Sequence, residues 1–242
     1  MGTTSRFLLL ALVLGAVLLR VAPLAAAALS VAPTRLELAP GIGSDAVTLR
    51  NDGDRSVLVQ VDTFRWTGPL NDEALEPTRE LLAVPSVFRV PPGARQVIRV
   101  ALRKPFAGTV EEAYRLLIAE VPEEDDGQRG GVRFALRLSL PVFVTPPGAQ
   151  ARPEWSLRRR GNGYLLVLRN TGNAHIRIRS LRLRSQSGDV VIAPDEPAAY
   201  VLAGGRHVWK LPAAPLGRGG PFILEAESQG GPISVPLSVE GS

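Results

Sequence analysis

Residues 132–144 read VRFALRLSLPVFV, and apolar side chains occupy every even position of this stretch. Alternation with a period of two is typical of a β-strand that buries one face. The odd positions begin with arginine, alanine and serine and then change to Pro141 and Phe143. The stretch is also long for a single strand. It therefore predicts a long strand whose buried face changes towards its end.

Two interpretations of this strand are compatible with its sequence. In the first, the even row belongs to the core and the odd row faces solvent. In the second, part of the even row leaves the core of its own domain and faces a cleft, where a partner covers it. Each apolar side chain buried by a partner contributes roughly 1.5–3 kcal/mol before other costs. An exposed apolar edge is otherwise an aggregation hazard, so a partner would have to protect it.

The rest of the chain carries the same β signature. Alternating runs are separated about every ten residues by Gly, Pro, Asn and Asp, which is typical of an antiparallel sandwich. Residues 72–82 contain Pro77 and predict a loop with at most one helical turn. The clearest runs are 56–66 (SVLVQVDTFRW), 95–103 (RQVIRVALR), 164–169 (YLLVLR) and 176–184 (IRIRSLRLR). The predicted fold class is all-β.

A linker divides this β pattern into two parts. Residues 145–153 (TPPGAQARP) combine proline and glycine, which stop strand pairing and stiffen the path of the chain. We expect one β-sandwich domain over residues 29–146 and a second over 150–242. Each part contains a similar turn, LRNDG at 49–53 and LRNTG at 168–172.

The first residues have the form of an export signal. A charged start is followed by an apolar run, FLLLALVLGAVLL at 7–19, and by small residues that predict cleavage within Ala26–Ala28. Residues 1–28 are therefore expected to be a signal peptide. The alternative is an uncleaved anchor, but the run is shorter than the roughly 20 apolar residues that span a bilayer. No second such run follows, so no stable membrane insertion is expected after cleavage.

Composition excludes several classes of function. The chain has no cysteine, and its two histidines, His175 and His207, do not fall in a metal-binding spacing. His175 lies beside a predicted turn and is interpreted as a surface histidine. The net charge is +5, with acidic residues interspersed among the basic ones, so no nucleic-acid partner is expected. We expect no catalytic residues, no metal and no cofactor, and hence no enzyme.

Several segments together resemble a known family, the periplasmic chaperones of the chaperone–usher pathway of pilus assembly, and its archaic-type branch in particular. The segments are VAPTRLEL at 31–38, NDGD at 51–54, FRVPPG at 88–93, VIRV at 97–100, YR at 114–115, EVP at 120–122 and the strand that ends before Pro146. The resemblance implies two immunoglobulin-like β-sandwich domains, a periplasmic location, and pilin or fimbrial subunits and an outer-membrane usher as partners.

The resemblance also implies a mode of binding. Such a chaperone lends the last strand of its first domain to an incomplete subunit: main-chain pairing supplies affinity, and alternate apolar side chains fill the groove of the missing strand. The strand concerned spans about 132–144 here. Its donor side chains are expected to be Val132, Phe134, Leu136, Leu138 and Leu140.

The family further anchors the terminal carboxylate of the subunit on two basic residues. The first corresponds to Arg35, whose guanidinium can hold a carboxylate through two hydrogen bonds. The second, a lysine in the family, falls on Pro141 here, which cannot bind a carboxylate. Arg137 and Arg89 are the candidate substitutes, and Arg89 is favoured because it lies between apolar neighbours at a strand end. An ordinary solvated arginine is the alternative for each.

A different function class stays open from the sequence. The chain could be a generic exported β-sandwich module for adhesion, or a structural subunit. Such a module would have a fully paired last strand in its first domain. A structural subunit is typically a single domain and often has a disulfide, whereas this chain has two predicted domains and no cysteine.

Overall fold

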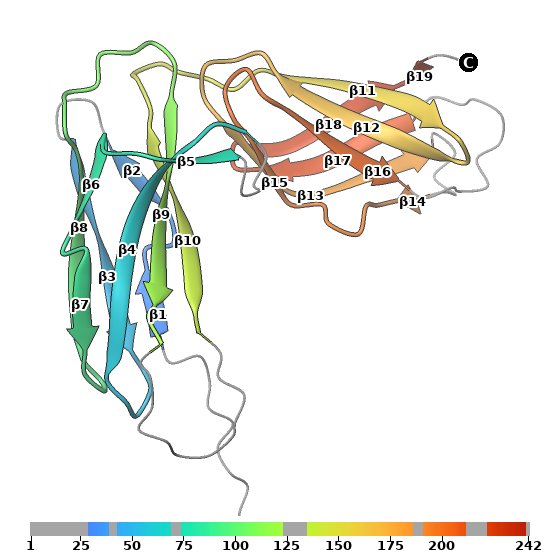
Figure 1. The fold of residues 1–242 in the computed structure, drawn as a ribbon. Coiled ribbons are helices and arrows are strands. Elements are labelled where there is room, and N and C mark those ends of the chain that lie inside the picture. The colour runs from blue at the N-terminus through green and yellow to red at the C-terminus, as the bar shows by residue number, and fades with distance from the viewer. Residues whose placement is uncertain are drawn as a thin grey trace, which may run out of the picture.

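The structure is a computed structural model that describes residues 29–38, 43–68, 74–122, 135–185, 191–211 and 222–240. Regular structure in these ranges is almost entirely β-strand, arranged as two sandwiches that follow one another in the chain (Figure 1). The predicted signal segment, residues 1–28, lies outside the described residues. Within the described ranges, no helix has the length and apolar character needed to cross a membrane.

The first sandwich packs two sheets face to face. A four-stranded sheet has the order β1-β3-β8-β6, and a six-stranded sheet has the order β2-β10-β9-β4-β5, with β7 paired to β4. The strands are β1 (Leu29–Ala32), β2 (Leu36–Leu38), β3 (Ser44–Asn51), β4 (Val57–Trp66), β5 (Leu75–Pro77), β6 (Leu81–Val84), β7 (Val87–Val90), β8 (Arg95–Leu102), β9 (Glu112–Glu120) and β10 (Arg137–Val144).

The second sandwich is built in the same way. One sheet has the order β16-β12-β11-β19, and the other has the order β14-β13-β17-β18, with β15 paired to β13. The strands are β11 (Pro153–Arg160), β12 (Gly163–Asn170), β13 (Ile176–Ser185), β14 (Val191–Ile192), β15 (Ala199–Val201), β16 (Arg206–Leu211), β17 (Phe222–Ser228), β18 (Gly231–Leu237) and β19 (Val239–Glu240).

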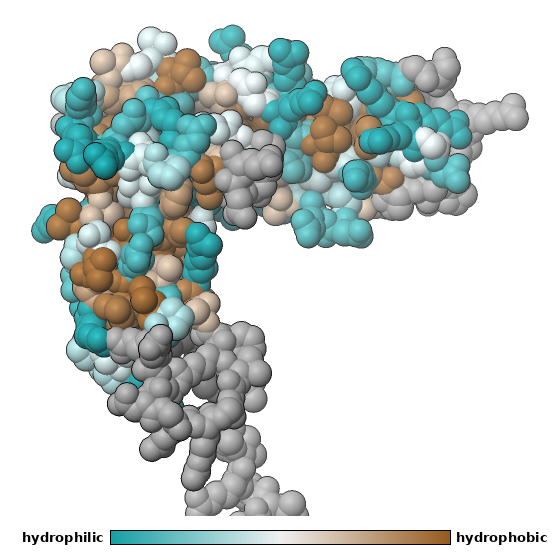
Figure 2. All heavy atoms as spheres, in the orientation of Figure 1, coloured by the Kyte–Doolittle hydropathy of each residue, from teal (hydrophilic) through white to brown (hydrophobic). Residues whose placement is uncertain are grey.

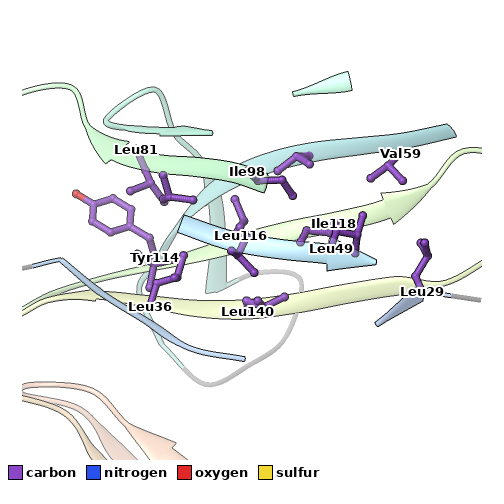
Figure 3. Packing of buried hydrophobic residues seen from close by; sticks show 14 of the residues in the cluster. Leu29, Leu36, Leu49, Val59, Leu81, Ile98, Tyr114, Leu116, Ile118 and Leu140 are labelled. Atoms are coloured by element: carbon purple, nitrogen blue, oxygen red, sulfur yellow. The ribbon is translucent and has the colours of Figure 1, made fainter. Parts of the chain in front are cut away.

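Each sandwich has its own apolar core, filled by the inward-facing residues of alternating strands. In the first sandwich, Leu49, Ile98 and Leu116 are fully buried and meet between the two sheets (Figure 3). In the second, Leu166 and Leu224 are fully buried in the core. Two closed cores confirm the prediction of an all-β, two-sandwich fold.

The two sandwiches point in different directions, so the molecule is bent at the junction between β10 and β11 (Figure 1). In this view the first sandwich shows apolar residues gathered in its lower half, whereas the second shows mostly hydrophilic side chains on the same side (Figure 2).

Two sequence predictions need correction. Within 72–82 the described residues form β5 and part of β6 rather than a loop, because β5 completes the edge of β4 by pairing Leu75 with Trp66. The long strand predicted over 132–144 is assigned as β10 from Arg137 onwards, and residues 132–134 lie outside the described residues.

Candidate functional site: an incomplete sheet edge beside the domain junction

Strand β10 is fully paired on one side only. It runs antiparallel to β9 along its whole length, with Arg137 opposite Ala119 and Val144 opposite Glu112. On its other side it pairs in parallel with β2, but only over Val142–Val144. Among the described residues, the stretch Arg137–Pro141 has no strand on that side. We call this stretch the open edge.

The backbone groups of the open edge can be assigned from one hydrogen bond. The Glu120 amide donates to the carbonyl oxygen of Leu136 at 2.9 Å, so the even residues of β10 direct their backbone groups at β9. The odd residues therefore direct theirs the other way. Arg137 and Ser139 present both an N–H and a C=O to the open edge, whereas Pro141 has no N–H to offer.

The even side chains of β10 form a row that passes from buried to half-exposed. Leu140 is only 3% exposed and lies in the core of the first sandwich, as Figure 3 shows. Leu138 and Leu136 are partly buried against the same core. The predicted donor residues Val132 and Phe134 lie outside the described residues. Of the predicted donor side chains, the structure places Leu136, Leu138 and Leu140 on one face of β10. Leu140 is already covered by its own domain.

The odd side chains change character because the second sandwich covers the end of β10. Phe143 is fully buried and stacks on the ring of His175, with centroids 3.7 Å apart and planes 9° apart. Trp66 and Tyr200 pack around the same ring, at centroid distances of 6.1 and 5.9 Å from Phe143. The sequence change at Pro141 and Phe143 therefore marks a contact within the chain.

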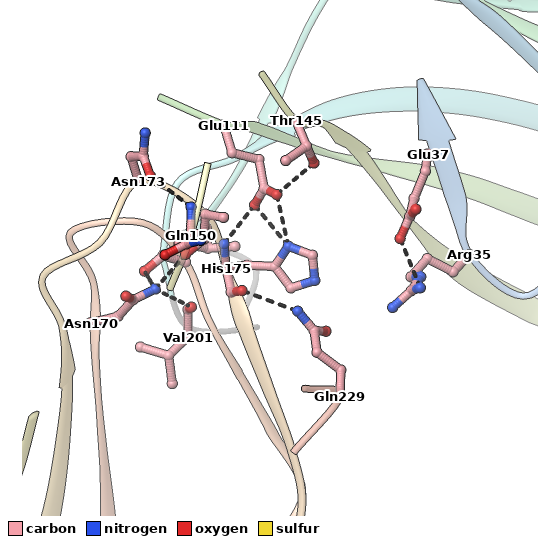
Figure 4. Close-up of polar contacts among 12 residues, drawn as sticks. Arg35, Glu37, Glu111, Thr145, Gln150, Asn170, Asn173, His175, Val201 and Gln229 are labelled. Carbon is pink, nitrogen blue, oxygen red and sulfur yellow. Dashed lines mark hydrogen bonds and ion pairs between the residues drawn. The ribbon is translucent and has the colours of Figure 1, made fainter. Parts of the chain in front are cut away.

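Polar contacts at this junction are also satisfied within the chain. The Glu111 carboxylate accepts a hydrogen bond from the backbone N–H of His175 at 2.9 Å and lies 2.8 Å from its ring Nδ1 (Figure 4). The Thr145 hydroxyl donates to the same carboxylate at 2.7 Å. His175 is 5% exposed, so its interpretation as a surface histidine was wrong. It belongs to a buried contact between the two sandwiches.

The two predicted anchors lie far apart. Arg35 precedes β2, is about one third exposed, and forms an ion pair with Glu37 at 2.7 Å (Figure 4). Continuing the β2–β10 register by one residue places it beside Pro141. Arg89 is exposed on β7 and pairs with Leu58 of β4, which corresponds in register to a point on β10 six residues before Pro141. That offset alone is about 20 Å at the strand rise per residue. The structure does not bring Arg35 and Arg89 together.

Arg137, the other candidate substitute for the family lysine, is exposed at the start of β10. It points to the same side of the sheet as Pro141 but lies four residues before it, about 13 Å along the strand.

The structure reveals a further basic residue that sequence reasoning missed. Arg115 lies on β9 directly opposite Pro141 and is only 4% exposed. Its guanidinium carbon lies 3.8 Å from the ring centroid of Trp66. Burial lowers the pKa of Arg115 to about 10. A signal existed in the sequence, because Arg115 is an unexpected charge in the apolar centre of the strand at 112–120.

The chain thus combines two immunoglobulin-like sandwiches with an incomplete sheet edge beside the junction between them. A model of the family described as pili and flagellar-assembly chaperone, PapD N-terminal domain, matches residues 28–150. The chain belongs to this family. The family predicted from the sequence motifs is thereby confirmed.

Individual relatives are more distant. The chaperone protein FimB/FhaD of Bordetella pertussis is 28% identical over 166 residues, which cover 63% of this chain and 66% of that protein, just under two thirds of its length. The chaperone–tip subunit complex CsuC–CsuE of the archaic Csu pili of Acinetobacter baumannii matches with a TM-score of 0.64 and 19% identity, over 87% of this chain and 98% of that one. The SafB chaperone, solved with the SafA pilin of Salmonella enterica, matches with a TM-score of 0.59 and 17% identity, over 87% and 94%. These structures share the fold.

Proposed function

We propose that this chain is a periplasmic chaperone that binds pilin-like subunits by lending them the open edge of β10, and that it delivers them to an outer-membrane usher. The observation that carries the proposal is the incomplete pairing of β10 over Arg137–Pro141. Similar structures hold a tip subunit or a pilin beside the chaperone, which supports the same class of partner here. The export signal expected at residues 1–28 is consistent with the compartment.

Binding on this edge would use two kinds of contact. A guest strand would complete the sheet through the outward backbone groups of Arg137 and Ser139. Apolar side chains of the guest would cover the half-exposed side chains of Leu136 and Leu138. Full burial of one such side chain contributes roughly 1.5–3 kcal/mol, and the gain here is smaller because both leucines are already partly covered. Val132 and Phe134 would extend the same row.

Leu140 is proposed to be a core residue of the first sandwich and not a donor side chain. Because it is 3% exposed without any guest, it supports the strand from within the core. The donor row proposed for contact with a subunit is therefore Val132, Phe134, Leu136 and Leu138. Arg35 is proposed to receive the terminal carboxylate of the subunit, and Arg89 lies too far from it to share one carboxylate.

Co-purification with pilin-like subunits of the same organism tests the proposal. Leu136→Asp should lower the yield of the complex at least about tenfold, because a charge placed against the guest strand costs more than the 1.4 kcal/mol that a tenfold change represents. Val208→Asp is the matched control, since Val208 is 42% exposed on the second sandwich, away from the open edge. Equal yields from Leu136→Asp and wild type would contradict the proposal.

Amide exchange provides a second readout without any substitution. The Arg137 and Ser139 amides should exchange quickly in the free protein, because no strand of the described residues lies on their side of β10. They should become protected in the complex, where a guest strand supplies their acceptors. Protection of both amides in the free protein would mean that the edge is already paired.

A further inference from the structure

The outward side of one sheet in the second sandwich carries a group of apolar side chains. In this sheet β12 lies between β11 and β16 (Figure 1). Leu166 and Trp209 are cross-strand neighbours and are buried in the core. Side chains alternate along a strand, so Leu165, Val167 and Val208 point the other way, towards solvent. Val167 lies directly opposite Val208, which is 42% exposed.

Basic side chains flank these apolar residues at both ends. At one end, Arg158 of β11 and Lys210 of β16 lie on either side of Leu165. At the other end, Arg169 of β12 lies directly opposite Arg206 of β16. All four basic residues are exposed. We call this surface, the outward side of β11, β12 and β16, the basic face.

The pair Arg169–Arg206 places two like charges opposite each other, which is unfavourable in a sheet. The acidic residues of β11, β12, β16 and β19 are Glu154 and Glu240. Glu154 is the neighbour of Arg169 on β11, and Glu240 forms an exposed ion pair with Arg158 at 3.1 Å. An anion bound between Arg169 and Arg206 would remove their mutual repulsion.

The arrangement of the basic face suits a layer of lipid headgroups. Apolar side chains with basic ones around them are typical of protein surfaces that lie on a membrane. Arg169 and Leu165 are four residues apart on β12, so the two basic ends are separated by about 14 Å. Headgroup phosphates form a continuous layer and can reach both ends in any orientation, whereas an acidic protein would need carboxylates at a matching spacing. Long basic side chains can also extend to the phosphates while apolar ones enter the acyl boundary.

We propose that the basic face docks on an anionic phospholipid surface. Val167 and Val208 then lie at the acyl boundary, and Arg169 and Arg206 share a headgroup phosphate. Arginine suits this role because its planar fork binds phosphate through two hydrogen bonds. The proposal goes beyond the proposed function, and it does not depend on capture of a subunit by β10, which belongs to the other sandwich.

Sedimentation with lipid vesicles tests the proposal. The chain without residues 1–28 is mixed with vesicles of phosphatidylcholine, either pure or containing phosphatidylglycerol. Wild type should sediment with the anionic vesicles only, and high salt should release it. The double variant Arg169→Gln, Arg206→Gln should bind anionic vesicles at least about tenfold more weakly, since each basic residue near such a surface contributes roughly fivefold.

The double variant Arg182→Gln, Arg184→Gln is the matched control. It removes the same charge from the other sheet of this sandwich, where both arginines form ion pairs with Glu225. Its affinity should stay within about threefold of wild type, because screening limits the reach of charges that do not face the membrane. The substituted side chains lie on the surface, so folding should be retained, and near-ultraviolet circular dichroism verifies it.

Val208→Asp provides a separate readout. It places a negative charge in the apolar centre of the basic face and should abolish binding to anionic vesicles. Capture of subunits should be unchanged, because Val208 lies away from the open edge.

Binding to neither kind of vesicle, equal binding to both, or equal losses in the two double variants would overturn the proposal. Binding of polyglutamate but not of anionic vesicles would also overturn it, in favour of an acidic protein as the partner. None of these results would refute the chaperone function, which is tested by capture of whole subunits and by its loss in Leu136→Asp.

Discussion

At the scale of single residues, Arg35 is engaged by a carboxylate that a guest could displace. Its partner Glu37 is more than half exposed, and ion pairs of this kind contribute only about 0–1 kcal/mol in water. A terminal carboxylate that arrives with a guest strand would be partly shielded from water, which strengthens its attraction to Arg35. Replacing Glu37 by the carboxylate of the guest as the partner of Arg35 should therefore cost little free energy.

Replacing Arg35 tests that exchange. Arg35→Ala should reduce the amount of co-purified subunit at least about tenfold, because one charge-assisted contact to the carboxylate is lost. Arg50→Ala is the control, since Arg50 is similarly exposed and ion-paired, to Asp52 at 2.8 Å, but lies on β3 in the other sheet. Normal capture by Arg35→Ala would rule out the anchoring role.

At the scale of elements, the two similar turns at 49–53 and 168–172 are held by the same kind of contact. Asn51 and Asn170 are both fully buried. The Asn51 side chain donates to the carbonyl oxygens of Arg55 and Val90 at 2.6 and 2.8 Å. The Asn170 side chain donates to the carbonyl oxygen of Ala174 at 2.7 Å, among others. Each asparagine ties its turn to a neighbouring segment of the sandwich.

The second turn also holds the linker. The Arg152 amide donates to the side-chain oxygen of Asn170 at 3.0 Å, and the Thr171 amide donates to the carbonyl oxygen of Arg152 at 2.9 Å. A Cβ at Gly172 would lie 2.2 Å from the carbonyl oxygen of Gln150, so only glycine allows this close approach. The predicted linker therefore lies against the second sandwich.

Asn170→Ala should destabilise the second sandwich by about 2–4 kcal/mol, because it leaves several buried backbone groups without partners. Urea unfolding followed by tryptophan fluorescence measures the change, since Trp155 and Trp209 lie in that sandwich. Asn162→Ala, in the exposed turn between β11 and β12, should change stability by less than about 0.5 kcal/mol. Similar effects of the two substitutions would show that the buried amide is not needed.

At the scale of the whole molecule, a packed joint connects the two sandwiches. Glu111, in the first sandwich, accepts hydrogen bonds from Thr145 at the start of the linker and from His175 in the second sandwich. The side chain of Asn173, in the second sandwich, donates to the carbonyl oxygen of Thr109 in the first, at 2.8 Å. The contact of Tyr200 with Arg115 also depends on this joint, because the two residues belong to different sandwiches.

Glu111→Ala should weaken the joint by about 3 kcal/mol, because it leaves buried donors without an acceptor. Urea unfolding should then separate into two transitions, one for each sandwich, and X-ray scattering should show a wider range of molecular dimensions. Glu240→Ala is the control, since it removes only an exposed ion pair with Arg158. Unfolding of Glu111→Ala in one transition at the wild-type urea concentration would contradict this account.

Much of the fold could be predicted because strand signals are local. Alternation along 56–66 and 95–103 needs only neighbouring residues to be recognised, and both runs became strands, β4 and β8. The turn residues at 51–54 and 170–173 are equally local. The site was less accessible, since the pairing of β10 with β2 joins segments about one hundred residues apart. Arg89 seemed a suitable anchor because its sequence neighbours are apolar, but register places it on a distant strand.

The amino-acid sequence by itself determined the all-β fold class, the division into two sandwiches and the family, because periodicity, turn residues and motif order are properties of neighbours along the chain. Only the tertiary structure decided that His175 is buried, that Leu140 belongs to the core and that Arg115 lies buried beside Pro141. Burial and charge pairing depend on which distant strands meet, and no local pattern contains that information.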